Sequence, residues 1–371
     1  MTTIRMLPPH RPSIVDVARR AGVSASTVSR SLRGTSHVAQ ETRDRVLRAA
    51  NELQYVPSPA ASRLASGRTH AVGVIVPFES RWFFSEVLSG AEGVLREAGY
   101  DLLLYNVGDL ASRRGFFASM PLRRRVDAVL VVSSSLDERE AAALEALDVP
   151  MSLVGGRMAG RPSVGIDDEA GAATAVRHLI VLGHRDIAMI SGESGDPLGR
   201  SNTLARRAGF CAALREAGIP ERDDRVVSQP WGVTGGVRAM EQLLGRAQLP
   251  TAVFAECDEM ALGALQTLRR ARLDVPGRVS LIGFDDHEMA PVGDLTTISQ
   301  PVRMQGRMAA RMLLDDLEGR AEGDGREGNG GGNGRDGGGQ DRGGQERGAE
   351  IVLPTRLVVR GSTGPPPAPA A

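Results

Sequence analysis

The pattern of apolar and polar positions changes twice along this chain of 371 residues. Up to Leu53, apolar residues recur three and four positions apart, which is the spacing of short amphipathic helices. From Ala71 onward, short uninterrupted apolar runs alternate with helical patterns. Between residues 319 and 349 apolar side chains almost vanish. The pattern therefore predicts a small helical part, a large α/β part and a polar insertion.

The first helical stretch, IVDVARRAGVSASTVSRSLRG (14–34), is typical of two helices joined by a tight turn. Gly22 suits the left-handed residue just past a helix end, and Ser24 is a good N-cap for the next helix. Two such helices form the unit that enters a DNA major groove, although they also occur as a purely structural pair. The buried faces would carry Ile14, Val17, Ala18, Val28 and Leu32.

A third helical pattern spans residues 39–53 and would close this small core. Tyr55-Val56-Pro57 ends it. The segment SPAASRLA (58–65) can form one short helix, but eight residues do not sustain a helix alone in water. We therefore expect a linker whose helix orders only when something supports it.

Positive charge is concentrated at the N-terminal end of the chain. Residues 1–66 hold ten Arg against four acidic residues, a formal charge of +6, whereas the whole chain balances 45 basic with 45 acidic residues. A local basic excess on a neutral chain favours phosphate binding by one module.

The large part of the chain is predicted to be a doubly wound α/β structure. Continuous apolar strands that alternate with helices indicate parallel sheets covered on both faces, and the number of units favours two subdomains. Ligands bind at the carboxyl ends of such strands, here between the two lobes. The expected strands are 72–77, 101–106, 127–133, 187–191, 252–256, 279–285 and 351–362; clear helical patterns cover 84–98, 170–182 and 260–270.

Composition excludes several classes of protein. Two cysteines, Cys211 and Cys257, form neither a disulfide framework nor a metal-binding spacing. The N-terminus lacks an apolar signal region, and no apolar run is long enough to span a membrane. We therefore expect a cytoplasmic protein without a metal or other cofactor. Fourteen of residues 319–348 are Gly, which predicts a disordered loop.

With these residues in view, the chain resembles transcription regulators of the lactose repressor (LacI/GalR) family. The resemblance covers roughly residues 12–318 and 350–363, and it rests on several separate motifs. These are DVARRAGVSASTVSRSL (16–32), YVP (55–57), DEMALGAL (258–265), GFDD (283–286), LTTISQP (295–301) and LPTRLVVRGST (353–363).

The resemblance implies an all-α helix-turn-helix head and a two-lobed effector domain like that of periplasmic binding proteins. The expected boundaries are a DNA-binding domain (1–57), a hinge helix and linker (58–69), an effector-binding and dimerisation domain (70–363), a Gly-rich insertion (319–349) and a flexible tail (364–371). The N-terminal lobe would comprise about 70–167 and 298–318, and the C-terminal lobe about 168–297 and 350–363.

The resemblance also assigns residues to DNA. Ala25, Ser26 and Arg30 would read bases, with Arg30 as the candidate for a bidentate contact to guanine. Family members usually carry Asn where this chain has Arg33, so that contact is altered. Residues that would contact or align phosphates are Ser13, Ser24, Thr27, Ser29 and His37; for Thr27 and Ser29, simple capping is an equal alternative.

In the family, paired hinge helices lie in the minor groove and a Leu wedges into a base step; Leu64 holds that position here. Packing between the hinge helices is the alternative role for Leu64. Ser58 replaces the usual Asn and Pro59 follows it, which a first helical turn tolerates.

The effector cleft is assigned in the same way. Arg206 matches the ligand-binding Arg of the family, Asp285 matches a carboxylate that accepts ligand hydroxyls, and Trp231 lies where an aromatic often stacks on a sugar. Cys257 replaces a usual Asn, which argues against an ordinary hexose. Weaker candidates on loops at strand ends are Ser80, Trp82 and Ser133.

Other classes fit less well. A solute-binding protein of a transporter shares the two-lobed fold, but it would need an export signal and no helix-turn-helix. The acidic clusters 167–169 and 285–287 lack a partner set for catalysis and are typical of helix caps. No basic residue flanks Cys257, and Glu256 and Asp258 would raise the pKa of its thiol, so redox sensing is disfavoured.

The combined hypothesis is a sequence-specific DNA-binding repressor controlled by a small-molecule effector, a sugar or related metabolite. A homodimer, or a tetramer built from it, would bind a palindromic operator in double-stranded DNA because two-fold protein symmetry is mirrored in the site. Closure of the lobes on the effector would order or melt the hinge helices. The sequence leaves open whether the effector is an inducer or a corepressor.

Overall fold

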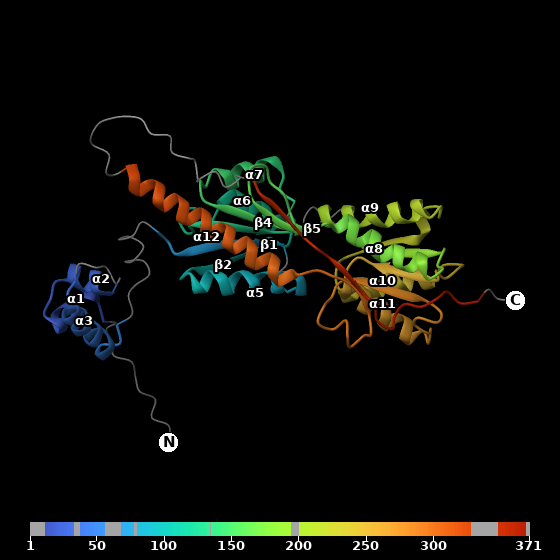
Figure 1. Ribbon diagram of the computed structural model, residues 1–371, viewed down its shortest axis with the longest axis horizontal. Coiled ribbons are helices and arrows are strands. Elements are labelled where there is room, and N and C mark those ends of the chain that lie inside the picture. The colour runs from blue at the N-terminus through green and yellow to red at the C-terminus, as the bar shows by residue number, and fades with distance from the viewer. Residues whose placement is uncertain are drawn as a thin grey trace, which may run out of the picture. The chain divides into compact units, whose positions relative to one another are not determined.

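The computed structural model describes residues 12–32, 38–55, 68–77, 80–133, 135–193, 200–327 and 348–368, and it divides into two compact units, 1–69 and 70–371 (Figure 1). Arg33, His37 and Leu64 lie outside the described residues, as does the predicted hinge helix.

The first unit is a three-helix head. Its helices are α1 (Ile14–Ala21), α2 (Ala25–Leu32) and α3 (Gln40–Glu52). Ser13 begins α1 with a capping box to Asp16, and Gly22 ends it with φ of 66°, in the left-handed region that favours glycine. The predicted helix-turn-helix and third helix are confirmed. The shared core consists of Val17, Ala18, Ala21, Val28, Val46, Ala49 and Ala50.

The second unit contains two six-stranded sheets. The first is wholly parallel in the order β11-β5-β4-β3-β1-β2. Apolar side chains of its strands alternate between a face packed on α5 and α12 and a face packed on α6 and α7. The elements are β1 (Ala71–Val76), α5 (Trp82–Glu97), β2 (Asp101–Asn106), α6 (Leu110–Ser119), β3 (Ala128–Val132), α7 (Glu138–Glu145), β4 (Met151–Val154), β5 (Ser163–Ile166), α12 (Val302–Glu327) and β11 (Glu350–Leu353).

The second sheet has the order β12-β10-β9-β8-β6-β7, parallel except for β12. Helices α8 and α9 cover one face, and α10 and α11 cover the other (Figure 1). The elements are α8 (Asp168–Val181), β6 (Ile187–Gly192), α9 (Arg200–Glu216), a 3₁₀ turn (Asp223–Arg225), β7 (Val226–Gln229), α10 (Val233–Leu244), β8 (Ala252–Ala255), α11 (Asp258–Arg270), β9 (Ser280–Asp285), β10 (Thr296–Ser299) and β12 (Arg356–Val358).

The two lobes repeat one strand order, and the chain crosses between them three times. The crossings follow β5, β10 and β11. In each sheet the first strand of the lobe lies between the second and the third, so the connections change direction beside it. Ligands of doubly wound sheets bind at this switch point, outside the carboxyl ends of the strands.

The end of the chain differs from the prediction. A single strand over 351–362, assigned with 350–363 to the C-terminal lobe, is wrong. β11 pairs with β5 in the first sheet, and only β12 joins the second, where it pairs with β10. Pro354 follows β11 directly and has no N–H to donate to a ladder, which suits the change of sheet at this point.

Two expectations of disorder are also corrected. Helix α12 continues through residues 319–327, because each residue added to an existing helix gains a hydrogen bond without a new nucleus. In the expected flexible tail, Gly364 is held at both backbone groups: its N–H donates to the Ser280 hydroxyl (3.0 Å), and its carbonyl oxygen lies 2.9 Å from His184 Nε2. Residues 328–347 lie outside the described part of the chain.

Candidate ligand cleft and nucleic-acid interface

The outward face of α2 is polar and small. Ser26 and Arg30 are exposed one turn apart, and the Arg30 Nε donates to the Ser26 carbonyl at 3.3 Å. Val28 and Ser31 are buried on the opposite side of the helix. Ala25, Thr27 and Ser29 are half-buried beside the exposed pair. The arrangement presents one long guanidinium group among small side chains, which allows close approach to a groove.

Hydroxyl groups cluster at the N-terminal end of α2. The Ser24 hydroxyl accepts a hydrogen bond from the Thr27 N–H (3.2 Å) and shares hydrogen bonds with the hydroxyls of Ser26 (2.8 Å) and Thr27 (2.9 Å). Ser13 is likewise engaged in capping α1. These hydroxyls shape the helix N-termini, where N–H groups and the helix dipole favour phosphate.

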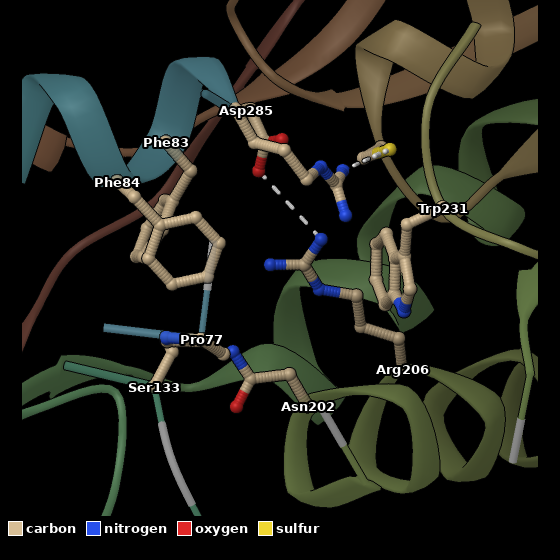
Figure 2. A pocket seen from close by; sticks show the side chains of 10 residues that line it. Pro77, Phe83, Phe84, Ser133, Asn202, Arg206, Trp231 and Asp285 are labelled. Atoms are coloured by element: carbon tan, nitrogen blue, oxygen red, sulfur yellow. Dashed lines mark hydrogen bonds and ion pairs between the residues drawn. The ribbon is translucent and has the colours of Figure 1, made fainter. Parts of the chain in front are cut away.

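A pocket lies between the two lobes of the second unit and contains about 510 Å³ of space, part of it open to solvent. Figure 2 shows the Arg206 guanidinium between Trp231 and the rings of Phe83 and Phe84. Most of the lining residues lie within a few positions of a strand's carboxyl end, as the fold requires. The lining consists of Pro77, Arg81, Phe83, Phe84, Ser133, Asn202, Arg206, Trp231, Cys257 and Asp285.

Arg206, on α9, is the buried centre of the second lobe's wall. Its Nε donates to Asp168 Oδ1 (2.8 Å), and its Nη1 donates to the Glu256 carbonyl and lies 3.6 Å from Asp285 Oδ1. The guanidinium also lies 3.8 Å from the Phe284 ring centroid. Burial opposes the charge, but Asp168, Asp285 and Glu256 together raise the pKa of Arg206. The cation is therefore fixed in position by groups from three separate segments of the chain.

Asp285 ends β9 with φ of 120°, a strained region for a residue with a side chain. Its Oδ1 accepts from Gln300 Nε2 at 2.7 Å, and Gln305 in turn donates to Gln300. Burial raises the pKa of Asp285 to about 6, although Arg206 and the Gln300 hydrogen bond act in the opposite direction. This carboxyl group is thus oriented by a relay of amides and titrates near neutral pH.

Glu256 and Asp168 complete the acidic side of this wall. Glu256 accepts from the Ser191 hydroxyl (2.7 Å) and the Gly192 N–H (2.8 Å). Burial raises the pKa of both carboxyl groups, and Arg206 offsets part of the rise. The second lobe therefore places two buried carboxyl groups, Glu256 and Asp285, and the half-buried Asp168 around one guanidinium.

Ser133 contributes a polar group to the first lobe's wall. Its N–H donates to the Val154 carbonyl at 2.7 Å, but its buried hydroxyl has no hydrogen-bond partner among the residues that the structure describes. Gly155, with φ of 64°, leaves room for this hydroxyl, because a Cβ there would come within 2.6 Å of Ser133 Oγ. A buried hydroxyl without a partner is costly unless something else binds it.

Arg81 bridges the lobes. It comes directly before α5 in the first lobe, yet its Nε and Nη2 lie 3.0 and 2.6 Å from Glu259 Oε2 on α11. Its Nη2 also approaches Cys257 Sγ at 3.7 Å, and its guanidinium covers the Trp231 ring at 4.8 Å from the centroid. Arg81 thus joins the two walls at the mouth of the pocket.

The comparisons with known proteins agree with this geometry. Residues 13–58 match the model of bacterial regulatory proteins, lacI family, and residues 176–327 match a periplasmic binding protein-like domain. Catabolite control protein A of Priestia megaterium is 35% identical over 81% of this chain and 91% of its own length. The chain belongs to the LacI family. The HTH-type transcriptional repressor PurR of Erwinia tasmaniensis is 37% identical over 84% of this chain and 92% of its own.

Solved structures extend the LacI-family match to the whole fold. The Lac repressor dimer bound to operator and the anti-inducer ONPF aligns with a TM-score of 0.78 and 26% identity, covering 96% of this chain and all of that one. The complex of the regulator CelR with cellobiose aligns with a TM-score of 0.65 and 30% identity, covering 95% and 100%. This LacI-family chain is a DNA-binding transcriptional repressor with an effector-binding domain.

Five of the seven cleft residues expected for a LacI-family regulator line the pocket: Ser133, Arg206, Trp231, Cys257 and Asp285. The other two, Ser80 and Trp82, are not among the lining residues. Ser80 is exposed, and the Trp82 ring packs on His287 of the other lobe with centroids 4.9 Å apart. At the start of a helix, neighbouring side chains point in different directions, so Arg81, Phe83 and Phe84 face the pocket instead.

Sequence reasoning missed Arg81, Phe83, Phe84, Asn202 and Asp168. Ser80 and Trp82 were chosen because they follow the carboxyl end of a strand. Arg81, Phe83 and Phe84 lie on the same segment, so the same criterion could have found them. Asp168 was interpreted as part of a cap. The cap is its neighbour Asp167, whose carboxylate accepts from the Ala170 N–H, whereas Asp168 binds Arg206.

Cys257 is buried, and burial raises the pKa of its thiol. The pKa of Cys257 is raised, as expected, but the main cause is burial and not the flanking carboxylates. The absence of a nearby cation, inferred from the sequence, is wrong, because Arg81 contacts the sulfur from the other lobe.

The described residues contain no group of His, Cys, Asp and Glu side chains arranged to hold a metal ion. No helix among them is both long and apolar enough to cross a membrane.

Proposed function

We propose that this repressor binds a palindromic operator in double-stranded DNA as a homodimer, and that a small polyhydroxylated molecule bound between its lobes controls that binding. The partnerless Ser133 hydroxyl, facing the same pocket as Arg206 and Asp285, is the observation that carries the second half of the proposal. The duplicated α/β lobes and the helix-turn-helix head are the parts that such a regulator requires.

The lining favours a sugar or a related metabolite. Ser133 can donate or accept one hydrogen bond, Arg206 supplies donors, and Asp285 supplies an acceptor. Aromatic rings of Phe83, Phe84 and Trp231 offer apolar surface to the carbon faces of a sugar. Sugars occupy two related regulators, one with cellobiose and one from Enterococcus faecium with ribose. Because Cys257 offers a thiol where relatives have an amide, the hydroxyl pattern recognised here differs from that of a common hexose.

On the DNA side, Arg30 is proposed to contact a guanine edge, with Ala25 and Ser26 shaping the neighbouring positions. The hydroxyls of Ser13, Ser24, Thr27 and Ser29 would align phosphates, as would His37. Leu64 would wedge between two base pairs. Non-specific affinity would come from phosphate contacts and discrimination from the base contacts.

Coupling would run through the separation of the lobes. The chain crosses between the lobes at three points, so closure on an effector turns one lobe against the other, and the linker enters the first lobe at His70. An effector that binds one arrangement better shifts the equilibrium by that difference, typically about 1–3 kcal/mol. An inducer would weaken operator binding, and a corepressor would strengthen it. We assign no catalytic role to the cleft, and we expect the protein to act in the cytoplasm.

The effector side is tested by measuring operator affinity and thermal unfolding of the full chain with a panel of sugars, sugar alcohols and nucleosides. The operator is first obtained by selecting bound fragments from genomic DNA. A true effector raises the melting temperature and changes operator affinity, and Arg206→Gln abolishes both responses. If no polyhydroxylated compound does either, the effector class proposed here is wrong.

The reading head is tested by Arg30→Ala. Losing a bidentate guanine contact should cost about 1–3 kcal/mol and relax preference at one base pair per half-site. Arg45→Ala, an exposed Arg on α3, removes the same charge as a matched control and should leave the preference unchanged. Unchanged selectivity in Arg30→Ala would reject the assignment. Leu64→Ala should weaken specific binding far more than non-specific binding.

A further inference from the structure

Three consecutive arginines, Arg123, Arg124 and Arg125, form an exposed basic turn on the first lobe. The turn comes between α6 and β3. None of the three guanidinium groups forms an ion pair with a carboxylate that the structure describes. Arg123 and Arg124 also border an open hollow on this surface. The head and the cleft account for no part of this turn.

The basic turn lies where the chain from the head enters the second unit. Asp127, at the end of the turn, donates its N–H to the Ala71 carbonyl (2.8 Å), and its carboxylate accepts from the His70 N–H (2.7 Å). His70 is the first residue of that unit. Because β1 and β3 are parallel neighbours, this is the amino edge of the sheet, remote from the carboxyl ends that line the cleft.

Two of the acidic groups at this edge have partners in the structure. Asp127 is bonded to the His70 N–H, and Asp148 accompanies Arg320, whose Nη1 lies 3.5 Å from its carboxylate. Asp101, at the start of β2, is exposed. The three arginines are consecutive and exposed, so they concentrate positive charge at one point of this edge.

The linker limits how far that surface is from DNA. Residues 56–69 span at most about 50 Å when fully extended. Duplex DNA carries one negative charge per roughly 1.7 Å of its axis and extends beyond the half-site that one head covers. We propose that Arg123, Arg124 and Arg125 bind the phosphate backbone of the DNA held by the head, as a second contact made by the first lobe.

The inference rests on DNA binding by the head and adds a contact outside it. Such a contact supplies affinity without base selectivity and is strongly salt-dependent. It would also place the effector-binding unit itself on the DNA, so that movement of the lobes alters a phosphate contact directly.

The test is a triple substitution of Arg123, Arg124 and Arg125 by Gln in the full chain. Affinity for an operator duplex with long flanks is measured between 50 and 200 mM KCl. Each lost phosphate contact should lower the slope of log affinity against log salt by about 1, and affinity at 100 mM should fall on the order of tenfold or more. Base preference in a half-site selection should stay unchanged.

The matched control is the same substitution at Arg269, Arg270 and Arg272, exposed at the end of α11 in the other lobe. These residues lie at the amino edge of the second sheet, away from the linker, and their loss changes the net charge equally. A wild-type salt slope in the Arg123–Arg125 variant, or equal changes in the two variants, would overturn the proposal. Arg30→Ala tests base reading by the head separately. Failure of the phosphate contact proposed for Arg123–Arg125 can therefore be distinguished from failure of DNA recognition by the head.

Discussion

The two walls of the cleft come from lobes with one strand order, yet they offer different chemistry. The first lobe presents Pro77, Phe83 and Phe84 with one partnerless hydroxyl. The second presents a guanidinium group fixed among three carboxyl groups, two of them buried. Arg81 belongs to the first wall, and its guanidinium forms an ion pair with Glu259 of the second lobe.

The difference shows that the fold determines the position of the site, whereas the residues at the strand ends determine its chemistry. A buried, fully connected charge network holds its donors in place before a ligand arrives, so it suits orientation of hydroxyl groups. An aromatic wall tolerates small shifts and suits closure. A ligand is therefore expected to bind the second lobe first and to be covered by the first.

The largest effect should come from Arg206→Leu. It leaves Asp168, Glu256 and Asp285 without their buried counter-charge, and breaking such a network costs about 3–5 kcal/mol. Urea unfolding at pH 7 measures the loss. The loss should shrink toward pH 5, because burial raises the pKa of all three carboxyl groups and protonation removes the uncompensated charge. A pH-independent loss would show that packing, not charge, is the main role of Arg206.

The next effect is the pH dependence carried by Asp285. Its pKa is raised from 3.8 to about 6, so the folded state binds more protons than the unfolded state between these values. Stability from this group is therefore present at low pH and lost as pH rises through about 6. Asp285→Asn mimics the protonated form.

The free energy of unfolding of Asp285→Asn, relative to wild type, should accordingly rise by about 2–3 kcal/mol between pH 4 and pH 7. Chemical denaturation at four or five pH values measures it. Asp224→Asn is the control, since Asp224 is half-buried at the surface and hydrogen bonds from Arg222 lower its pKa, the opposite direction to Asp285. If the difference in unfolding free energy between Asp285→Asn and wild type does not change with pH, this carboxyl group does not titrate between pH 4 and pH 7.

A smaller effect is expected for the Arg81–Glu259 pair, the link between the walls. Its side chains are 16% and 19% exposed, so their interaction should contribute about 1 kcal/mol. Either Arg81→Gln or Glu259→Gln should also open the unliganded cleft, which small-angle scattering would show as a larger radius of gyration. A double-mutant cycle that shows no coupling energy between Arg81 and Glu259 would show that this pair does not hold the two lobes together. Arg177 and Glu216, paired within the second lobe, provide a control cycle.

The smallest effect on stability belongs to Ser133→Ala. Removing a buried hydroxyl without a partner should be neutral or stabilise by roughly 0.5–1 kcal/mol. The same change should weaken effector binding tenfold or more if the ligand supplies the missing partner. Stability from urea unfolding and affinity from calorimetry separate the two. Loss of stability with unchanged affinity would give Ser133 a purely structural role.

Much of the fold could be predicted because its signals are local. The capping residues Ser24 and Gly22, and apolar runs such as those of β1 and β3, predict the local structure directly. The four-residue strands β4, β5, β7 and β10 were not predicted, since so short a run has no clear period. The division of the last strand between two sheets depends on pairing with β5 and β10, far away in sequence.

The cleft was predictable in part for the same reason. Arg206 and Asp285 stand in recognisable motifs, whereas the partners that give them their properties are non-local. Asp168 lies 38 positions from Arg206, and Arg81 lies 178 positions from Glu259. Only the folded chain brings these charges together, and the shifted pKa values arise from that assembly.

The split between β11 and β12 gives the last stretch of the chain a disproportionate role during synthesis. Both sheets lack an outer strand until residues 350–358 have left the ribosome, although every other strand is made by Ser299. A stop codon anywhere between 300 and 349 would therefore remove the outer strand of both sheets at once and leave β5 and β10 as the edge strands. Translation of these few residues completes both lobes together, so a truncated repressor would fail as a whole rather than lose one function.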